Sequence, residues 1–395
     1  MKLTRRLLCL PFRPKRVLGI TKVTLWDIIR SKYPDWDEMQ LHDKFVSLQS
    51  GISPDILKQE HEMQIDCENQ LNEIMKKIGC NFRMVKRVNN ANDDVEWADL
   101  VISIGGDGAF LLASRLIQNN KKAIIGINPK TIIDEQRTFS IDHCTDIENI
   151  FEKLQEGRYN LLMRSRIRTT MYGKDINHEP YHLDEKTRSV KDLMKDKDDG
   201  KNSEIVVKSN ETKLADFLQE SHRRVLPWLA LNEVYMGEFL STGTITLTIQ
   251  VDDQDVYKIQ CSGICVCTGS GSRSWFRSMN LQAPETVKRL IKIAMGKDID
   301  EDDALKVIQS YHRSLSFDPE DERMSYMVRE LYRARKWPKP KSSPERRMCR
   351  KVKVISHGFD AGLVIDGGVT LPFNDGTTAV FEIHSEDGLK NLVIR

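Results

Sequence analysis

Three glycines surround one aspartate directly after an apolar run, in the segment VISIGGDGAF (101–110). Glycine costs roughly 0.5–1 kcal/mol relative to alanine inside regular structure, so this loop should need its backbone freedom. Gly105, Gly106 and Gly108 would let backbone N–H groups approach phosphate oxygens at the start of a helix. Asp107 would then hold a cation or accept a proton from a hydroxyl nucleophile, and an aspartate that only caps the helix is the alternative.

A second polar pair interrupts an apolar run later in the chain. Asn232 and Glu233 lie within LNEVYMGE (231–238). A buried Asn–Glu pair needs hydrogen-bond partners, and ribose hydroxyls or an adenine edge would supply them. The end of an ordinary strand is the alternative explanation of the same residues.

Two further segments carry small polar residues. CTGSGSRSW (267–275) offers hydroxyl and backbone donors at 270–272, Arg273 for phosphate oxygens, and Trp275 to cover a base or a nicotinamide ring. A serine–glycine loop with a packing tryptophan is the alternative. VIDGG (364–368) indicates a strand that runs into a turn and by itself assigns no chemistry.

The elements that must position these motifs fall into two patterns. The first half of the chain alternates strands and helices, which is typical of a parallel sheet flanked by helices. The predicted strands are 16–23, 82–88, 100–104 and 123–127. The predicted helices run from Ser53 to Gly79, over 108–119, and over 145–157 with Thr145 as cap. Open sheets of this kind bind ligands at the carboxyl edge of their strands, where the GGDG loop lies. After residue 160 short β-branched runs predict antiparallel β structure, with a turn at 374–378 and one helical stretch at about 283–312.

The composition limits the function classes. The chain has 395 residues, enough for two domains, with 39% hydrophobic and 30% charged residues. A formal net charge of +2 gives no global case for nucleic-acid binding, and no apolar run reaches the ~18 residues of a membrane span. We therefore expect neither a nucleic-acid nor a membrane partner.

The eight cysteines are scattered along the chain. Cys261, Cys265 and Cys267 share a parity, so on one strand they would face the same side. A metal site would need a fourth ligand at a typical spacing, so no metal ligand is assigned. We interpret the three as buried strand thiols in a reducing compartment.

Three charged segments lie beside these elements. Residues 1–15 are basic without an acidic residue, which resembles a mitochondrial presequence, with a basic tail as the alternative. Residues 184–204 hold 13 charged residues out of 21, and a disordered insertion at about 184–213 is predicted. Residues 333–351 hold nine Lys or Arg and are interpreted as a solvated loop.

Taken in order, the motifs resemble the NAD kinase family and, within it, the mitochondrial type. The family pattern is a GGDG loop, an N-E pair, a Thr/Gly/Ser-rich segment that ends in an aromatic residue, and a late D-G. This chain carries these motifs at 105–108, 231–233, 268–275 and 366–368, and the likeness covers about 16–170 and 226–395.

The resemblance implies ATP-dependent phosphorylation of the 2′-hydroxyl of the adenosine ribose of NAD, which yields NADP and ADP. Asp107 matches the proposed catalytic base, and Asn232 and Glu233 match residues that hold NAD. The remaining residues matched to nucleotide binding are Gly105, Gly106, Gly108, Thr268, Ser270, Gly271, Ser272, Arg273, Ser274, Trp275, Asp366 and Gly367. Mg²⁺ is implied with ATP, and the implied setting is a homodimer in the mitochondrial matrix.

The implied fold class is α/β plus all-β. An N-terminal Rossmann-like parallel α/β domain (16–160) precedes a β-rich, sandwich-like domain (161–375), with the active site in the cleft between them. Residues 376–395 form a C-terminal segment that can return to the first domain.

The sequence also departs from the family pattern. Ala109 replaces the threonine of the common GGDGT loop, and Gly269 and Trp275 stand where the usual later segment has proline and tyrosine. Two other functions therefore stay open. A degenerate kinase would bind NAD or NADP without turnover, and a GGDG-type lipid or sphingoid kinase would have no N-E pair.

Overall fold

The computed structural model describes residues 10–21, 23–37, 39–41, 43, 53–86, 92–129, 139, 142–143, 147–173, 176–182, 222–239, 243–254, 256–332 and 345–394. The chain divides into two compact units. The first runs to Arg164 and resumes at Ser385, and the second spans Ser165–His384. Most of the predicted presequence, the charged insertion and the cap at Thr145 lie outside the described residues.

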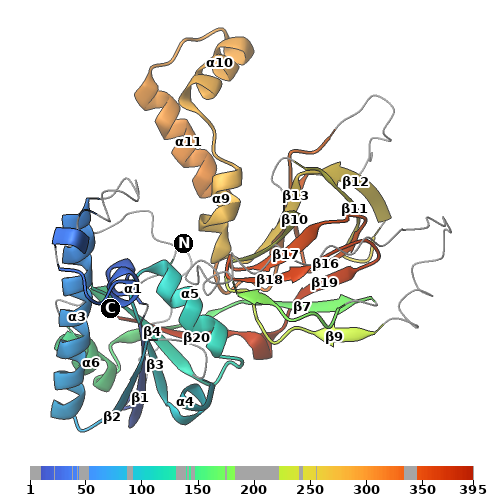
Figure 1. The fold of residues 1–395 in the computed structure, drawn as a ribbon. Coiled ribbons are helices and arrows are strands. Elements are labelled where there is room, and N and C mark those ends of the chain that lie inside the picture. The colour runs from blue at the N-terminus through green and yellow to red at the C-terminus, as the bar shows by residue number, and fades with distance from the viewer. Residues whose placement is uncertain are drawn as a thin grey trace. The chain divides into compact units, whose positions relative to one another are not determined.

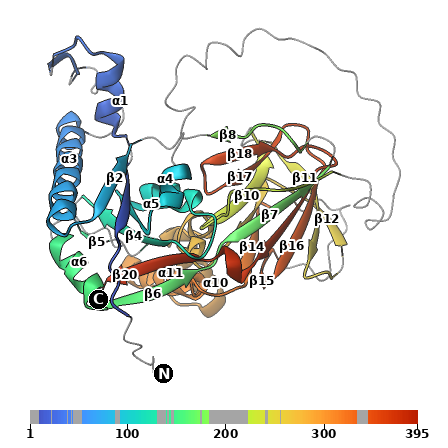
Figure 2. The same cartoon turned by 90° about the horizontal axis from the view of Figure 1, so that it is seen from below.

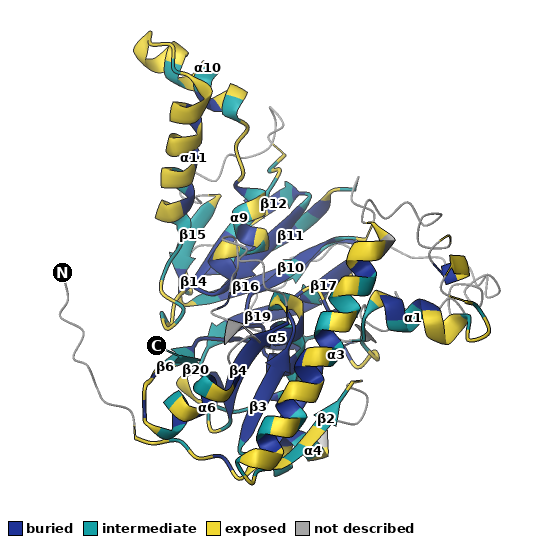
Figure 3. Ribbon diagram, turned by 90° about the vertical axis from the view of Figure 1, so that its left-hand side faces the viewer, coloured by how far each residue is buried: buried dark blue, intermediate teal, exposed yellow. Residues whose placement is uncertain are grey.

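A mostly parallel sheet forms the centre of the first unit (Figure 1). Its path is β2 (Asn81–Val85), β1 (Arg16–Thr21), β3 (Leu100–Ile104), β4 (Ala123–Asn128), β20 (Leu389–Ile394) and β6 (Tyr159–Arg164), with β5 (Asp142–His143) beside β4. All residues of β3 and β4 are buried, as expected for strands that are covered on both faces (Figure 3). The pairs are parallel except for β20 with β6, which is antiparallel.

The helices of the first unit follow from local sequence signals. They are α1 (Leu25–Lys32), α3 (Pro54–Lys77), α4 (Asn92–Trp97), α5 (Asp107–Leu116) and α6 (Ile147–Gln155), with the 3₁₀ turn η4 (Ser385–Asp387) before β20. The predicted start of α3 is confirmed, because the Ser53 side chain accepts a hydrogen bond from the N–H of Asp55. Cys67, Leu71 and Met75 of α3 pack into the core against the sheet and α6.

Two antiparallel sheets make up the second unit (Figure 2). The path of the first is β15 (Arg346–Cys349), β14 (Met324–Arg329), β13 (Gly263–Cys267), β10 (Glu233–Glu238), β17 (Ala361–Ile365), β18 (Val369–Pro372) and β8 (Tyr181–His182). The path of the second is β12 (Val256–Cys261), β11 (Ile245–Val251), β16 (Lys351–Ser356), β19 (Thr378–Ile383), β7 (Ile167–Tyr172) and β9 (Arg223–Val225). Aliphatic side chains from both sheets share one core, in agreement with the predicted β-rich domain.

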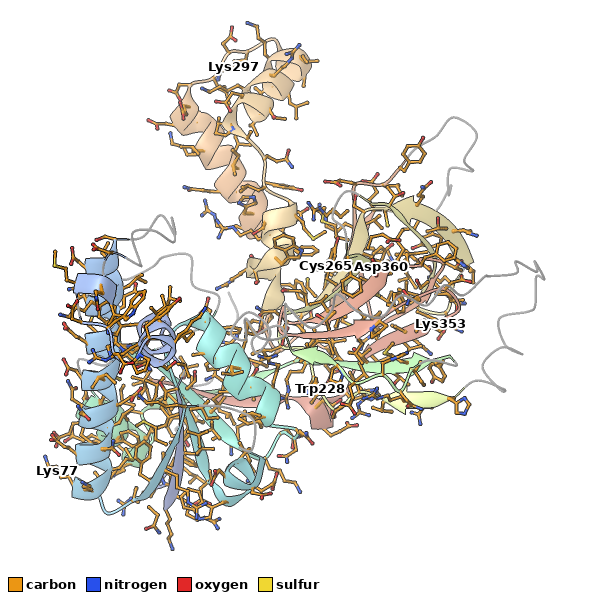
Figure 4. All side chains as sticks on the ribbon, viewed as in Figure 1. Lys77, Trp228, Cys265, Lys297, Lys353 and Asp360 are labelled. Carbon is orange, nitrogen blue, oxygen red and sulfur yellow. The ribbon has the colours of Figure 1, made fainter. Side chains whose placement is uncertain are left out.

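Helical segments leave the first of these sheets after β13. They are the 3₁₀ turn η3 (Gly271–Arg273), α9 (Trp275–Met279), α10 (Pro284–Met295) and α11 (Glu301–Leu315). Figure 4 labels Lys297 at the tip of the α10–α11 pair. One helical stretch is predicted at 283–312, but Gly296 takes a φ of 64° and ends α10, and the Asp300 side chain caps α11.

The domain boundaries differ from the predicted ones. β6 extends to Arg164, where its pairing with β20 keeps it in the first unit. The segment 376–395 does not return as a whole, because β19 pairs with β16 and β7 within the second unit. The chain crosses back at Ser385, and β20 alone joins the parallel sheet.

Two smaller predictions are wrong. The basic segment 333–351 is not a solvated loop throughout, because Arg346–Cys349 pairs with β14 as strand β15. Cys261 does not share a face with Cys265 and Cys267, because the strand breaks at Ser262 and the chain passes from one sheet to the other. All three thiols are nevertheless buried, as predicted.

No helix among the described residues is long and apolar enough to cross a membrane.

Candidate functional site

The GGDG loop lies at the carboxyl end of β3 in the first unit. Gly106 is the N-cap of α5 with φ −82° and ψ −163°, and Asp107 is the first helical residue. The capping alternative for Asp107 is therefore wrong, because the cap residue is a glycine without a side chain. Gly106 and Gly108 are exposed, and a Cβ added at either would meet no atom within 4 Å. The loop thus presents open backbone at the positive end of a helix.

Gly105 is required by two independent constraints. Its φ is 140°, a region that side chains rarely adopt, and a Cβ there would lie 2.7 Å from the Cβ of Ala109. Ala109 is 3% exposed and packs beneath the loop. The residue that departs from the GGDGT pattern thus fills the inside of the turn.

The Asp107 carboxylate is held at the edge of the loop. Its Oδ1 accepts a hydrogen bond of 3.4 Å from the N–H of Phe139, and the Phe139 ring stacks on Phe110 at 4.8 Å between centroids. Asp107 is partly exposed, between the exposed Gly106 and Gly108.

In the second unit, the predicted Asn–Glu pair lies at the start of β10, and Asp366 holds its backbone. The Asp366 carboxylate accepts from three consecutive N–H groups: Leu231 at 2.7 Å, Asn232 at 2.8 Å and Glu233 at 3.0 Å. The Asp366 N–H donates back to the carbonyl of Glu233 at 3.0 Å. The late D-G motif therefore positions the N-E motif.

The turn itself explains the Asp-Gly sequence. Asp366 has φ 46° and Gly367 has φ 65°, and the Gly368 N–H donates to the Ile365 carbonyl at 3.0 Å. Positive φ angles at both central residues of the four-residue turn 365–368 are those of a type I′ turn, for which Asp-Gly is a preferred pair. This turn joins β17 to β18 and directs the Asp366 carboxylate at β10.

The Asn232 and Glu233 side chains are buried with unused acceptors. Asn232 is 2% exposed and Glu233 9% exposed, and within the described part of the chain neither Asn232 Oδ1 nor Glu233 Oε2 has a hydrogen-bond partner. Burial, with the negative charge of Asp366 as a second cause, raises the pKa of Glu233 from 4.5 to about 8. Such acceptors are costly to bury unless a ligand satisfies them.

The Thr/Gly/Ser-rich segment closes over the same backbone. Thr268 Oγ1 donates to the Leu231 carbonyl at 2.5 Å and accepts from the Gly271 N–H at 3.1 Å, and the Thr268 N–H donates to the Asn232 carbonyl at 2.9 Å. A Cβ at Gly271 would lie 2.0 Å from the Asn232 carbonyl oxygen. Only glycine therefore allows this turn to approach the pair.

The rest of the segment divides into buried and exposed residues. Ser270 and Ser272 are buried, and the Ser272 hydroxyl donates to the Gly269 carbonyl at 2.7 Å. Arg273 and Trp275 are exposed, and the Arg329 guanidinium lies 5.9 Å from the Trp275 ring centroid. Trp275 and Arg273 are thus available to a ligand, while Thr268 and Ser272 support the loop.

The structure brings Asn232, Glu233, Thr268, Gly271 and Asp366 together, and it places Asp107 with its three glycines in the other unit. The predicted cleft that would join the two groups stays a prediction. Sequence reasoning missed the segment that covers Gly269, where a Cβ would lie 2.0 Å from the carbonyl oxygen of Asp318. This contact spans about fifty residues, and no local signal marks it.

Comparison with known proteins adds independent information. No protein-family model matches the chain. The mitochondrial NAD kinase 2 of Xenopus tropicalis is 30% identical over 407 aligned positions, which cover 97% of this chain and 91% of the relative. The human mitochondrial NAD kinase 2 is 30% identical over 390 positions, which cover 97% and 85%. The chain belongs to the NAD kinase family.

Within the NAD kinase family it is of the mitochondrial type, as the sequence motifs indicate. A crystal structure of yeast NADH kinase in complex with NADH matches with a TM-score of 0.51 and 14% identity, covering 97% of this chain and 84% of that one. At this identity the likeness concerns the fold alone, and it agrees with the predicted α/β plus β-rich architecture of an NAD kinase.

Proposed function

We propose that the chain transfers the terminal phosphoryl group of ATP to the 2′-hydroxyl of the adenosine ribose of NAD, giving NADP and ADP. In this reaction the GGDG loop binds phosphate groups, and the second unit binds NAD. The reaction needs positioning, a proton acceptor and neutralisation of phosphate charge.

The observation that carries this proposal is the pair of unsatisfied acceptors on Asn232 and Glu233. Both side chains are buried, and Asp366 and Thr268 hold their backbone rigidly. A ligand that is rich in hydroxyl and amino donors would satisfy them, and the ribose and adenine of NAD are of this kind. An aliphatic lipid substrate would leave them unpaired, which argues against the lipid-kinase alternative.

Asp107 acts in this proposal as the general base. Its partly exposed carboxylate starts α5, beside open backbone that a phosphate group can approach. A carboxylate there can accept the proton of the attacking 2′-hydroxyl as the phosphoryl group transfers.

Mg²⁺ is proposed to arrive with ATP. Among the described residues, no group of three or more His, Cys, Asp or Glu side chains could hold a metal ion. Mg²⁺ does not need such a group, because it usually keeps several waters and binds through substrate phosphates and one or two carboxylates. Asp107 is the carboxylate of the loop that could contribute, and the ion would neutralise charge on the phosphates.

The decisive experiment is a turnover assay of the purified chain with NAD, ATP and Mg²⁺, in which an NADP-specific dehydrogenase detects the product. We expect NADP to form, and Glu233→Ala to raise the KM for NAD by about tenfold or more because it removes a buried acceptor. NAD binding by calorimetry without any NADP formation would support the degenerate kinase instead. Phosphorylation of a sphingoid base or diacylglycerol without NAD turnover would support a lipid kinase.

We propose the mitochondrial matrix as the location. The basic start of the chain supports it, and the relatives are named mitochondrial. We place the end of the presequence before residue 10 and not at the predicted residue 15, because the carbonyls of Leu10 and Lys15 accept hydrogen bonds from Tyr159 and Asn81 in the first unit. Protease protection inside purified mitochondria, compared between the full chain and a chain without residues 1–9, tests this.

A homodimer is also proposed, on the resemblance to the mitochondrial type. Light scattering of the purified chain should give twice the mass of one chain, 45.6 kDa each. A single-chain mass at assay concentrations would contradict it.

A further inference from the structure

The strand order of the first unit defines a topological switch point. From β1 the chain goes to β2 on one side, and from β2 it returns to β3 on the other side of β1. In open α/β sheets, ligands bind outside the carboxyl ends of the two strands where the order reverses, here β1 and β3. The GGDG loop follows β3, and Thr21, the last residue of β1, is in register with Ile104 just before that loop. The end of β1 therefore lies next to the start of the GGDG loop, at the same edge of the sheet.

A buried polar cluster lies at the end of β1. Thr21 Oγ1 donates to Glu68 Oε1 at 2.9 Å, and the Gln64 amide donates to the same oxygen at 3.3 Å and also contacts Thr21. Thr21, Gln64 and Glu68 are 0%, 8% and 5% exposed. A carboxylate at such a depth is expensive unless it is paired.

The partner of this carboxylate is Lys86, directly after β2. Its Nζ lies 3.1 Å from Glu68 Oε2, and the side-chain exposures are 44% for Lys86 and 7% for Glu68. An ammonium has three N–H donors, so donors remain for a ligand while Glu68 fixes the position of the head group. The cluster thus holds one cation at the carboxyl edge of the sheet.

The position of this cation suits a phosphate chain. β2 and β3 are the two neighbours of β1, so at a strand spacing of about 4.8 Å the end of β2 lies about 10 Å from the end of β3. A lysine side chain and a nucleotide phosphate chain together can bridge this gap from the open backbone of Gly106 and Gly108.

We propose that Lys86 binds the phosphate chain of a bound nucleotide and that Glu68 is its positioning residue. The assignment rests on the proposed function, because it takes the GGDG loop as the phosphate site. The triphosphate of ATP and the pyrophosphate of NAD share the required chemistry.

The test is calorimetric binding of ATP with Mg²⁺, and separately of NAD, to the full chain and to Lys86→Met. The dissociation constant for ATP, NAD or both should rise about tenfold or more, because a charge-assisted contact is lost. The nucleotide whose dissociation constant rises is the one that Lys86 contacts. Lys86→Arg should keep most of the affinity. Binding needs no turnover, so an inactive chain that still shows this difference would refute the proposed function and keep the Lys86 assignment.

Lys77→Met is the matched control. Lys77 is the last residue of α3, nine residues after Glu68, and is labelled in Figure 4. It pairs with Glu148, and both side chains are exposed. We expect its dissociation constants to stay within about twofold of the wild type. Lys86→Met values within twofold for both nucleotides, an equal effect of Lys77→Met, or no nucleotide binding by the wild type would overturn the proposal.

Glu68→Gln tests the positioning role through the direction in which the dissociation constant changes. Removing a negative charge alone would tighten the binding of an anionic ligand. If Glu68 instead holds Lys86 in place, the dissociation constant should rise severalfold in Glu68→Gln and stay unchanged when the substitution is made on the Lys86→Met background. A tighter complex would overturn the role of Glu68. Thermal unfolding of each variant confirms that it is folded.

Discussion

The two motif regions of this chain differ in how far their backbone is covered by other residues. The GGDG loop of the first unit is open: Gly106 and Gly108 are exposed, and no atom would meet a Cβ added there. The N-E region of the second unit is closed, because Asp366 and Thr268 bind its backbone and Gly271 packs against Asn232 at a distance that excludes any side chain.

Under the proposed function, in which the first region binds phosphate and the second binds a nucleoside, the contrast corresponds to two kinds of recognition. A phosphate group is recognised by backbone N–H groups and a helix end, so the first region must leave its backbone uncovered. A nucleoside is recognised by a few directed side-chain acceptors, so the second region must fix Asn232 and Glu233 before the ligand arrives. Substitutions should therefore affect chemistry in the open region and stability or NAD binding in the closed region.

The largest effect is expected from Asp107→Asn in the open region. Loss of a general base should lower kcat by about 10²–10⁴, and neither the midpoint of thermal unfolding nor the affinity for NAD should change. Coupled turnover assays measure kcat, and calorimetry measures the affinity for NAD and the midpoint of thermal unfolding. A kcat close to that of the wild type would remove Asp107 from the role of base.

Asp366→Ala should cause the largest loss of stability. It leaves the N–H groups of Leu231, Asn232 and Glu233 unsatisfied in a buried place, which we expect to cost about 3 kcal/mol or more. Urea unfolding measures the change.

Asp252→Ala is the control for this substitution. Asp252 also has a positive φ, and it accepts from the N–H groups of Arg350 and Lys351, of which the first is exposed and the second partly exposed. Water can replace an acceptor there, so the loss should be clearly smaller. Equal losses would show that burial of the N-E backbone is not what makes Asp366 important.

A pair of glycine substitutions compares the two regions directly. Gly271→Ala should destabilise the fold by about 1–3 kcal/mol and weaken NAD binding, because its Cβ would collide with the Asn232 carbonyl. Gly106→Ala should leave stability nearly unchanged, since its backbone is extended and the space is empty, and should raise the KM for ATP. A fully active Gly106→Ala enzyme would mean that phosphate does not approach this backbone.

The smallest effect concerns the pH dependence of stability. Because the pKa of Glu233 rises from 4.5 to about 8 on folding, the folded state binds the proton more tightly. The stabilisation that Glu233 gives the folded state is therefore fully present below pH 4.5. As the pH rises towards 8, the free energy of unfolding falls by up to about 1.4 kcal/mol per pH unit. Glu233→Gln should remove this slope, whereas Gln in place of the exposed Glu73 should keep it. An unchanged slope in Glu233→Gln would show that Glu233 is already ionised at neutral pH.

Local patterns in the sequence were sufficient for much of the fold. Apolar runs placed β1, β3 and β4 within two residues, and the Ser53 cap marked the start of α3. These features depend on neighbours along the chain, so one sequence contains them. Local patterns predict helix ends less well: the predicted helical stretch 283–312 is interrupted at Gly296, whose left-handed φ ends one helix before another begins.

The sequence by itself determined the order and the identity of the motifs, and hence the family to which the chain is assigned. Only the tertiary structure decided their roles. Asp366 clamps a backbone 133 residues away from it, β20 returns to a sheet begun near the other end of the chain, and Glu68 holds Lys86 behind the end of β1. Such contacts join residues that are distant in sequence, and their strength depends on burial, which exists only once the chain has folded.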